Sequence, residues 1–118
     1  MAGARVLMID DDTLFREMIA GVLRDAGYTV AAAPDGAEGL AWTAEFRPAV
    51  ILLDLVMPAM NGYAFLHAYR ATPPPHARVI VVSGSGTTTV PPGADAVLVK
   101  PFQMEDLLAL VARHVQGT

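Results

Sequence analysis

Five short apolar runs, separated by segments with helical periodicity, constrain the fold of this chain more than any other feature. Each run is almost free of polar side chains, which is typical of a strand buried on both faces of a sheet. The run at Ala49–Leu53 is the most strongly apolar and is expected at the centre of the sheet. The five expected strands are Arg5–Ile9, Tyr28–Ala33, Ala49–Leu53, Val79–Val82 and Ala96–Val99.

The segments between these runs carry apolar residues at the spacing of amphipathic helices. Gly27 is expected to end the first helix, and the third is expected over about 62–70, before three consecutive prolines. Right-handed crossovers then predict an α/β fold, a doubly wound parallel sheet with helices on both faces. The residues expected to face the sheet are Leu14, Met18, Val22 and Leu23, then Ala37, Leu40, Ala41 and Ala44, then Phe65, Leu66 and Tyr69, and finally Leu107, Leu108, Val111 and Val115.

The connection between the fourth and fifth expected strands breaks this alternation. Another helix would be expected there, but residues 84–93 read Gly-Ser-Gly-Thr-Thr-Thr-Val-Pro-Pro-Gly. Glycine, proline and consecutive β-branched residues all disfavour helix. The sequence therefore predicts that the fourth helix of the fold is shortened or missing.

Composition excludes several classes of protein. The 118 residues suit a single domain spanning 1–118. The absence of cysteine excludes disulfides and thiolate metal sites and fits the expected cytoplasmic location. A formal net charge of −4 argues against a general nucleic-acid binder. No apolar run approaches the roughly 20 residues of a membrane span.

Polar residues stand where the expected strands end, and parallel strands bring those ends to one edge of the sheet. Asp10, Asp11 and Asp12 follow the first strand, and Asp54 follows the third. One of the three acids, or Thr13, could simply cap the next helix. A cluster of like charges is unfavourable unless a cation neutralises it, and oxygen ligands without His or Cys suit Mg²⁺. We therefore expect a Mg²⁺ site in addition to a cap.

Ser83 and Lys100 follow the fourth and fifth expected strands and should reach the same edge. Lys100 is the only lysine of the chain, and the proline after it favours a sharp turn, with a cis bond possible. An ammonium and a hydroxyl can both contact phosphoryl oxygens. A carboxylate nucleophile, Mg²⁺, a lysine and a hydroxyl are the parts needed to transfer a phosphoryl group to an aspartate.

Four segments together form a recognisable pattern that spans most of the chain. It includes Asp-x-x-Met-Pro-x-Met-x-Gly from Asp54 and a Lys-Pro-Phe sequence from Lys100. The segments are Leu7–Asp12, Asp54–Gly62, Val81–Gly84 and Gly93–Phe102. In these segments the chain closely resembles the phosphoacceptor receiver domain of two-component response regulators.

The resemblance implies a flavodoxin-like, five-stranded sheet in the order 2-1-3-4-5. It also implies that Asp54 is the phosphoacceptor and a metal ligand. Asp11 would bind Mg²⁺ directly, Asp10 would act largely through water, and the Val56 carbonyl would be a further ligand. Ser83 would be the switch hydroxyl and Lys100 the lysine that contacts the phosphate.

The resemblance also implies the partners. The phosphoryl donor would be a phosphohistidine on a sensor histidine kinase or a histidine phosphotransfer protein. The output would be a downstream protein or a fused domain outside this chain, with no direct contact to nucleic acid or membrane. The domain would be a signalling module and not an enzyme, although it would catalyse its own phosphorylation and dephosphorylation. His67, His76 and His114 fall outside the pattern and are expected at the surface.

The chain departs from the family near the expected output face. Val97 stands where the family has an inward-turning Tyr or Phe, and Lys100 follows Ser83 by only 17 residues, fewer than is usual. We therefore expect a rebuilt output face, in which the segment 84–92 becomes ordered on the phosphoryl group. Val56 and Ser85 occupy positions that in the family influence the approach of hydrolytic water.

Three other functions remain open from the sequence. A haloacid dehalogenase-type phosphatase would use Asp10 as nucleophile, but the later acid pair it needs is represented only by Glu105 and Asp106, at the start of a helix. A flavodoxin-like cofactor carrier would need a first loop rich in Ser, Thr or Gly, where this chain has three acids. A receiver-like scaffold would keep the fold without using phosphorylation.

Overall fold

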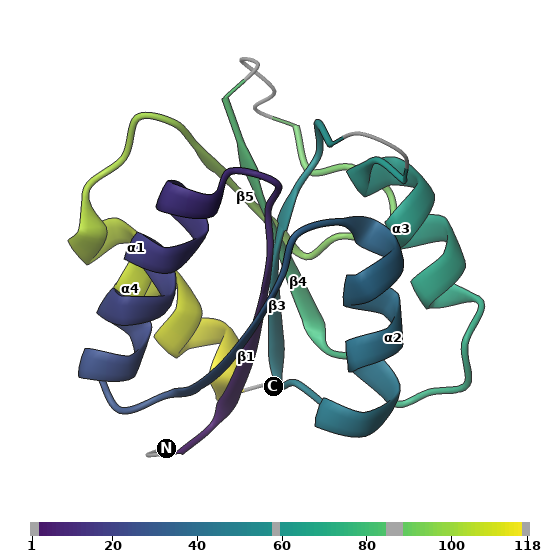
Figure 1. Cartoon of the computed structure of the whole chain (residues 1–118), viewed down its shortest axis with the longest axis horizontal. Coiled ribbons are helices and arrows are strands. Elements are labelled where there is room, and N and C mark those ends of the chain that lie inside the picture. The colour runs from purple at the N-terminus through teal and green to yellow at the C-terminus, as the bar shows by residue number, and fades with distance from the viewer. Residues whose placement is uncertain (1–2, 58–59, 85–88, 117–118) are drawn as a thin grey trace.

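The computed structural model describes residues 3–57, 60–84 and 89–116. The described chain forms a parallel sheet of five strands in the order β2-β1-β3-β4-β5, with four helices (Figure 1). The elements are β1 (Arg5–Ile9), α1 (Thr13–Asp25), β2 (Thr29–Ala33), α2 (Gly36–Phe46), β3 (Val50–Asp54), α3 (Gly62–Arg70), β4 (Arg78–Ser83), β5 (Ala96–Val99) and α4 (Met104–Val115). The predicted α/β fold and strand order are confirmed.

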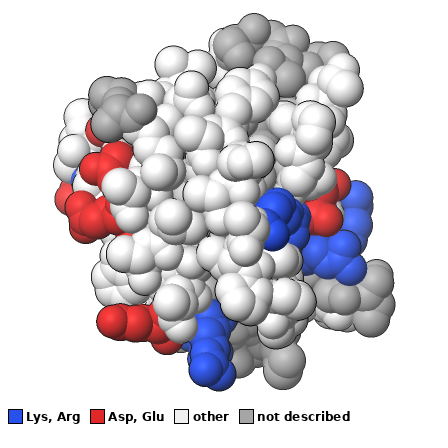
Figure 2. All heavy atoms as spheres, turned by 90° about the vertical axis from the view of Figure 1, so that its right-hand side faces the viewer, with Lys and Arg blue, Asp and Glu red and all other residues white. Residues whose placement is uncertain are grey.

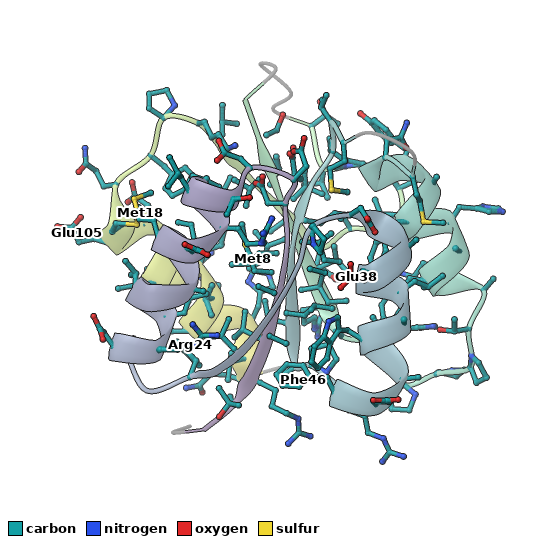
Figure 3. All side chains as sticks on the ribbon, in the orientation of Figure 1. Met8, Met18, Arg24, Glu38, Phe46 and Glu105 are labelled. Atoms are coloured by element: carbon teal, nitrogen blue, oxygen red, sulfur yellow. The ribbon has the colours of Figure 1, made fainter. Side chains whose placement is uncertain are left out.

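The helices cover both faces of the sheet, with α1 and α4 on one side and α2 and α3 on the other (Figure 1). Alternate residues of β1 therefore enter two separate cores. Val6 and Met8 pack with residues of α1 and α4, whereas Leu7 and Ile9 pack with residues of α3. In Figure 3 the Met8 side chain lies between the sheet and α1. Burial on both faces explains why the strands read as continuous apolar runs.

The buried face of α1 differs from the prediction. Leu14 and Met18 were expected to face the sheet, but their exposed fractions are 81% and 48%. Figure 3 shows Met18 on the side of α1 away from the sheet. Leu23 is buried as expected and Val22 is half-buried. The sheet also receives Ile19, which lies four positions before Leu23 in the row next to that of Leu14 and Met18. Periodicity alone could not choose between two neighbouring apolar rows of one helix.

The buried face of α2 was also predicted wrongly in part. Leu40 is half-buried against the core, but the alanines at 37, 41 and 44 are exposed. The buried residues of this helix are Gly36 and Gly39. A Cβ atom at Gly39 would lie 2.4 Å from Cδ1 of Ile9, so a side chain here would force the Ile9 side chain to move away from the helix.

The last two helices follow the prediction closely. In α3, Phe65, Leu66 and Tyr69 are buried, as expected. In α4, Leu107 and Val111 are buried, and the other two expected residues of this helix are half-buried. The observed strands differ from the predicted ones by a single residue at some ends. No helix in the described ranges is both long and apolar enough to cross a membrane.

The connection from β4 to β5 contains no helix in its described residues, 84 and 89–95, in agreement with the prediction. The residues 85–88, including Ser85, lie outside the described part of the chain. The end of the connection is held by Arg70 of α3, whose guanidinium donates hydrogen bonds to the carbonyl of Gly93. On the face that α2 and α3 present, charged side chains gather in a few groups, with uncharged side chains between them (Figure 2).

Candidate functional site

The strands end at the upper edge of the sheet in Figure 1. Three carboxylates meet at this edge. Asp10 follows β1 and Asp54 is the last residue of β3, and these two strands pair directly, with Ile9 opposite Leu53. One carboxylate oxygen from each of Asp10, Asp11 and Asp54 lies within 4.8 Å of the others. We call these three residues the acid cluster. Its ligand atoms are all oxygens, which suits a hard cation such as Mg²⁺.

Asp10 is the most buried member of the acid cluster, with 1% of its surface exposed. Its Oδ1 accepts a hydrogen bond of 2.9 Å from the N–H of Asp12. Its Oδ2 is buried and has no hydrogen-bond partner among the described residues. Burial raises the pKa of Asp10, while the Asp12 N–H and the charge of Lys100 act to lower it. A buried carboxylate oxygen without a donor is the position that a bound cation would satisfy.

Asp54 is partly buried, and its Oδ1 accepts a hydrogen bond of 3.1 Å from the N–H of Val56. Burial raises the pKa of Asp54 to about 6, and the neighbouring charge of Asp10 acts in the same direction. The Val56 N–H and the charge of Lys100 partly offset these effects. Asp54 is therefore mostly ionised at pH 7, although burial makes its charged form unfavourable. A carboxylate in this state suits a nucleophile or a metal ligand.

The three consecutive acids have divided roles. Asp12 is the N-cap of α1, and its carboxylate accepts a hydrogen bond of 3.1 Å from the N–H of Phe15. Capping thus accounts for one acid and leaves Asp10 and Asp11 in the acid cluster, with Asp11 exposed. The expectation of one cap plus a separate cluster is met by the geometry.

Ser83 and Lys100 reach the same edge of the sheet. Ser83 is buried at the end of β4, and its carbonyl accepts a hydrogen bond of 2.8 Å from the N–H of Lys100. The Lys100–Pro101 bond is cis. The Lys100 ammonium acts electrostatically on both Asp10 and Asp54, while its Nζ lies 4.1 Å from the centroid of the Phe15 ring. The acids, the hydroxyl and the lysine are therefore assembled at one site.

The loop after Asp54 is shaped by Gly62, the first residue of α3. Its N–H donates a hydrogen bond of 2.9 Å to the carbonyl of Leu55. A Cβ atom at this position would lie 2.6 Å from the Asp54 carbonyl oxygen, so a side chain here would push the loop away from the acid cluster. Of the predicted motif, Met57 is buried, Val56 is 69% exposed, and residues 58–59 lie outside the described part of the chain.

Two residues of α1 border the site and were not found from the sequence. Arg16 donates a hydrogen bond of 2.7 Å from Nη1 to the carbonyl of Asp10. Phe15 contacts Lys100, 85 positions further along the chain. No local pattern joins residues so far apart, although Phe15 lies in the same apolar row as Ile19 and Leu23.

The three histidines lie outside the site, as expected, but only His67 is fully exposed. His76 and His114 are half-buried, each with a ring nitrogen bonded to a backbone carbonyl, of Thr72 and Leu110. None of the three belongs to the acid cluster.

Comparison with known proteins places this chain in a family. The sequence matches the response regulator receiver domain over residues 6–112. It is 37% identical to the DNA-binding response regulator MtrA of Mycolicibacterium paratuberculosis, over 95% of this chain and 51% of that protein. It is 35% identical to the response regulator MprA of Mycobacterium ulcerans, over 97% of this chain and 51% of that protein. The chain thus spans about half the length of these curated relatives.

Solved structures show the same similarity. The chemotaxis response regulator CheY4 of Vibrio cholerae superposes with a TM-score of 0.81 and 35% identity, over 96% of this chain and 99% of that one. A CheY-like receiver domain from Methanospirillum hungatei gives a TM-score of 0.85 and 28% identity, over 98% and 95% of the two chains. The chain belongs to the response regulator receiver domain family, which is a family of signalling modules. This membership decides against the phosphatase and the cofactor carrier.

Proposed function

We propose that this chain is a phosphorylation-dependent receiver that accepts a phosphoryl group on Asp54 in a Mg²⁺-dependent reaction. The observation that carries the proposal is the acid cluster, in which the ionisable Asp54 lies beside a buried, unpartnered oxygen of Asp10. A receiver-like scaffold that does not use phosphorylation would have no need for such a cluster. Uncompensated carboxylates lower stability, so a fold without this chemistry would be expected to lose them.

The residues of the site have separate roles in the proposed reaction. An oxygen of the Asp54 carboxylate attacks the phosphorus of a phosphohistidine, so that an O–P bond forms as the P–N bond breaks. The leaving imidazole retains the electron pair of that bond and takes up a proton. Lys100 and Ser83 contact the transferring oxygens as a positive charge and a hydroxyl donor.

The acid cluster provides the expected Mg²⁺ site. Asp11, Asp54 and the carbonyl of Val56 would be direct ligands, and Asp10 would act largely through water. Bound Mg²⁺ would neutralise negative charge on the phosphoryl oxygens. The buried Oδ2 of Asp10 and the all-oxygen ligand set fit this ion.

The partners follow from the family. We propose that the donor is a sensor histidine kinase or a histidine phosphotransfer protein, and that residues 1–118 act as one receiver domain in the cytoplasm. The output would be a downstream protein or a domain fused outside this chain. MtrA is named as DNA-binding, but no DNA contact is proposed for this domain, whose net charge is −4.

Labelling with a small phosphodonor tests the proposal. Acetyl phosphate or phosphoramidate with Mg²⁺ should label the wild type, and Asp54→Asn should abolish the label. Asp25→Asn is a matched control, because Asp25 lies at the end of α1 away from the acid cluster, and it should be labelled normally. Labelling that survives Asp54→Asn and disappears in Asp10→Asn would identify Asp10 as the nucleophile. A wild type that is never labelled by donor or kinase would favour the scaffold.

A further inference from the structure

The Lys100 ammonium rests on an aromatic ring beside the acid cluster. Its Nζ lies 4.1 Å from the centroid of Phe15, within the range of a cation–π interaction. The ring of Phe102 packs edge-on against the ring of Phe15, with the two ring centroids 6.4 Å apart and the ring planes at 79°. The Phe15 ring, on the first turn of α1, thus contacts both the ammonium and a second ring.

Lys100 does not form an ion pair with the acid cluster. All 12 Asp and Glu residues of the chain lie in its described part, and no carboxylate oxygen there is within 4.0 Å of Nζ. By contrast, Asp95 forms ion pairs with Arg70 and Arg78. Yet Lys100 is close enough that its charge partly opposes the rise in the pKa values of Asp10 and Asp54 that burial causes. The ammonium is therefore near the carboxylates without pairing with them.

An ammonium beside three carboxylates would normally move onto one of them. A cation–π contact and a partly exposed ion pair have similar strengths, so a ring can decide which position the ammonium takes. If Lys100 did pair with Asp54 or Asp10, it would occupy oxygens that the expected Mg²⁺ needs. A cation that binds there would first have to displace the ammonium.

We propose that Phe15 is a positioning residue, which holds the Lys100 ammonium off Asp10 and Asp54 and so leaves the acid cluster open to Mg²⁺ before phosphorylation. This inference rests on the proposed function, because it assumes that the acid cluster binds Mg²⁺ and that Lys100 later contacts the phosphoryl group. Phe15 touches no reacting atom in this account, since it acts only through Lys100.

Two substitutions separate this role from simple packing. Phe15→Leu keeps an apolar side chain of moderate size but removes the π face. Phe15→Tyr keeps the π face. If Phe15 served only for packing, the two substitutions should have similar effects on Mg²⁺ affinity. If its ring binds the Lys100 ammonium, only Phe15→Tyr should preserve the affinity.

The readout is Mg²⁺ affinity of the unphosphorylated protein, measured from amide chemical shifts near Asp54 during MgCl₂ titration at constant ionic strength and pH 7.5. We expect Phe15→Leu to weaken Mg²⁺ binding by about three- to tenfold, on the scale of a cation–π contact. Phe15→Tyr should stay within about twofold of the wild type. In a Lys100→Gln background, Phe15→Leu should change the affinity little, because no ammonium is left to release.

Three outcomes would overturn the inference: unchanged Mg²⁺ affinity in Phe15→Leu, equal weakening in Phe15→Tyr, or a Phe15→Leu effect that persists without Lys100. If Phe15→Leu does not fold, the wild type still gives a test. The side-chain Hε protons of Lys100 should be shifted upfield by the ring current of Phe15 and should lose that shift when beryllofluoride binds. Hε protons at ordinary positions in the free protein would refute the contact.

The proposed function can fail separately from this inference. If wild-type protein binds Mg²⁺ with the expected dependence on Phe15 but is never labelled at Asp54, the phosphorylation proposal is wrong. The positioning role of Phe15 is then still supported. If Asp54 is labelled normally while Phe15→Leu leaves Mg²⁺ affinity unchanged, the receiver proposal is supported and the positioning role of Phe15 is wrong.

Discussion

The acid cluster and Asp95 place carboxylates in opposite electrostatic surroundings. Asp95 lies 3.3 Å from Arg70 and 3.5 Å from Arg78, and its Oδ2 accepts a hydrogen bond of 2.8 Å from the N–H of Val79. Among the described residues, Asp10 and Asp54 each accept one backbone hydrogen bond and form no ion pair. Burial raises the pKa values of both carboxyls. The charge of Asp95 is therefore balanced by nearby arginines, whereas the charges of the acid cluster are not balanced by an ion pair among the described residues.

The difference shows which region serves stability and which serves chemistry. Asp95 and Arg70 fasten the β4–β5 connection to α3, in a stretch where the described residues form no helix. The acid cluster instead concentrates negative charge where a cation and a phosphoryl group are expected. If this comparison is right, removing a carboxylate should have opposite effects on stability in the two regions.

The largest effect is expected from Asp95→Ala. This change leaves the Val79 N–H without its acceptor and removes both arginine contacts, so the unfolding free energy should fall by about 2 kcal/mol. Chemical denaturation measures it. Asp25→Ala removes a carboxylate that forms no hydrogen bond or ion pair among the described residues and should change stability by less than about 0.5 kcal/mol. Equal effects of the two substitutions would mean that the Asp95 network stabilises nothing.

Asp54→Asn should change stability in the opposite direction. Because burial raises the folded-state pKa of Asp54 to about 6, its charged form is unfavourable in the fold. This penalty is fully present above that value and is absent below the unfolded value of 3.8. In metal-free buffer the variant should therefore be more stable than the wild type by about 1–2 kcal/mol at pH 7.5, after allowance for solvent screening.

The pH dependence of the stability difference between Asp54→Asn and the wild type is the control for this prediction. Denaturation of both proteins should give an advantage for Asp54→Asn that shrinks as pH falls below 6 and vanishes near pH 4. An advantage that is constant with pH would show that the substitution acts through packing and not through the charge of Asp54.

Mg²⁺ should stabilise the wild type through the acid cluster alone. At a concentration tenfold above its Kd the expected gain in unfolding free energy is about 1.4 kcal/mol, visible as a rise in Tm. The gain should be preserved in Asp95→Ala and largely lost in Asp11→Ala. It should also be smaller at pH 5 than at pH 7.5, because protonated Asp54 binds the cation poorly. Equal gains in both variants would place the bound ion elsewhere.

The smallest effect concerns the lifetime of the phosphoryl group. Val56 is 69% exposed beside Asp54, and its apolar side chain cannot orient a water molecule. We expect Val56→Asn to lose phosphate a few times faster than the wild type in dephosphorylation time courses, because a polar amide can position the attacking water. Asp95→Ala should leave the lifetime unchanged. Faster loss from the wild type than from Val56→Asn would contradict this role.

Most of the fold could be predicted because both faces of the sheet are covered, which makes every strand an uninterrupted apolar run. The buried faces of α1 and α2 were predicted only in part, at Leu23 and Leu40. Leu14 and Met18 belong to an apolar row next to the buried one, and α2 packs through Gly36 and Gly39, which carry no hydrophobic signal. The turn-rich connection before β5 was predictable because Gly and Pro disfavour helix in any context.

The members of the site could also be located from the sequence, because Asp10, Asp54, Ser83 and Lys100 are each the first polar residue after an apolar run and Asp11 follows Asp10 directly. Their electrostatic state could not. Whether an oxygen of Asp10 is left without a hydrogen-bond donor is decided by how the folded chain buries it. The position of the Lys100 ammonium over the Phe15 ring requires a contact between distant parts of the chain. The pairing of Asp95 with Arg70 and Arg78 depends on tertiary structure in the same way.

The most direct test of this account is the titration of the Asp54 carboxyl carbon by ¹³C NMR, with and without Mg²⁺. The account predicts a pKa of about 6 in metal-free buffer, raised by burial and by the charge of Asp10, and a clear fall of that pKa when Mg²⁺ is added. An Asp54 that titrates near the ordinary value of 3.8 and does not respond to Mg²⁺ would contradict the claim that the acid cluster is uncompensated and awaits a cation.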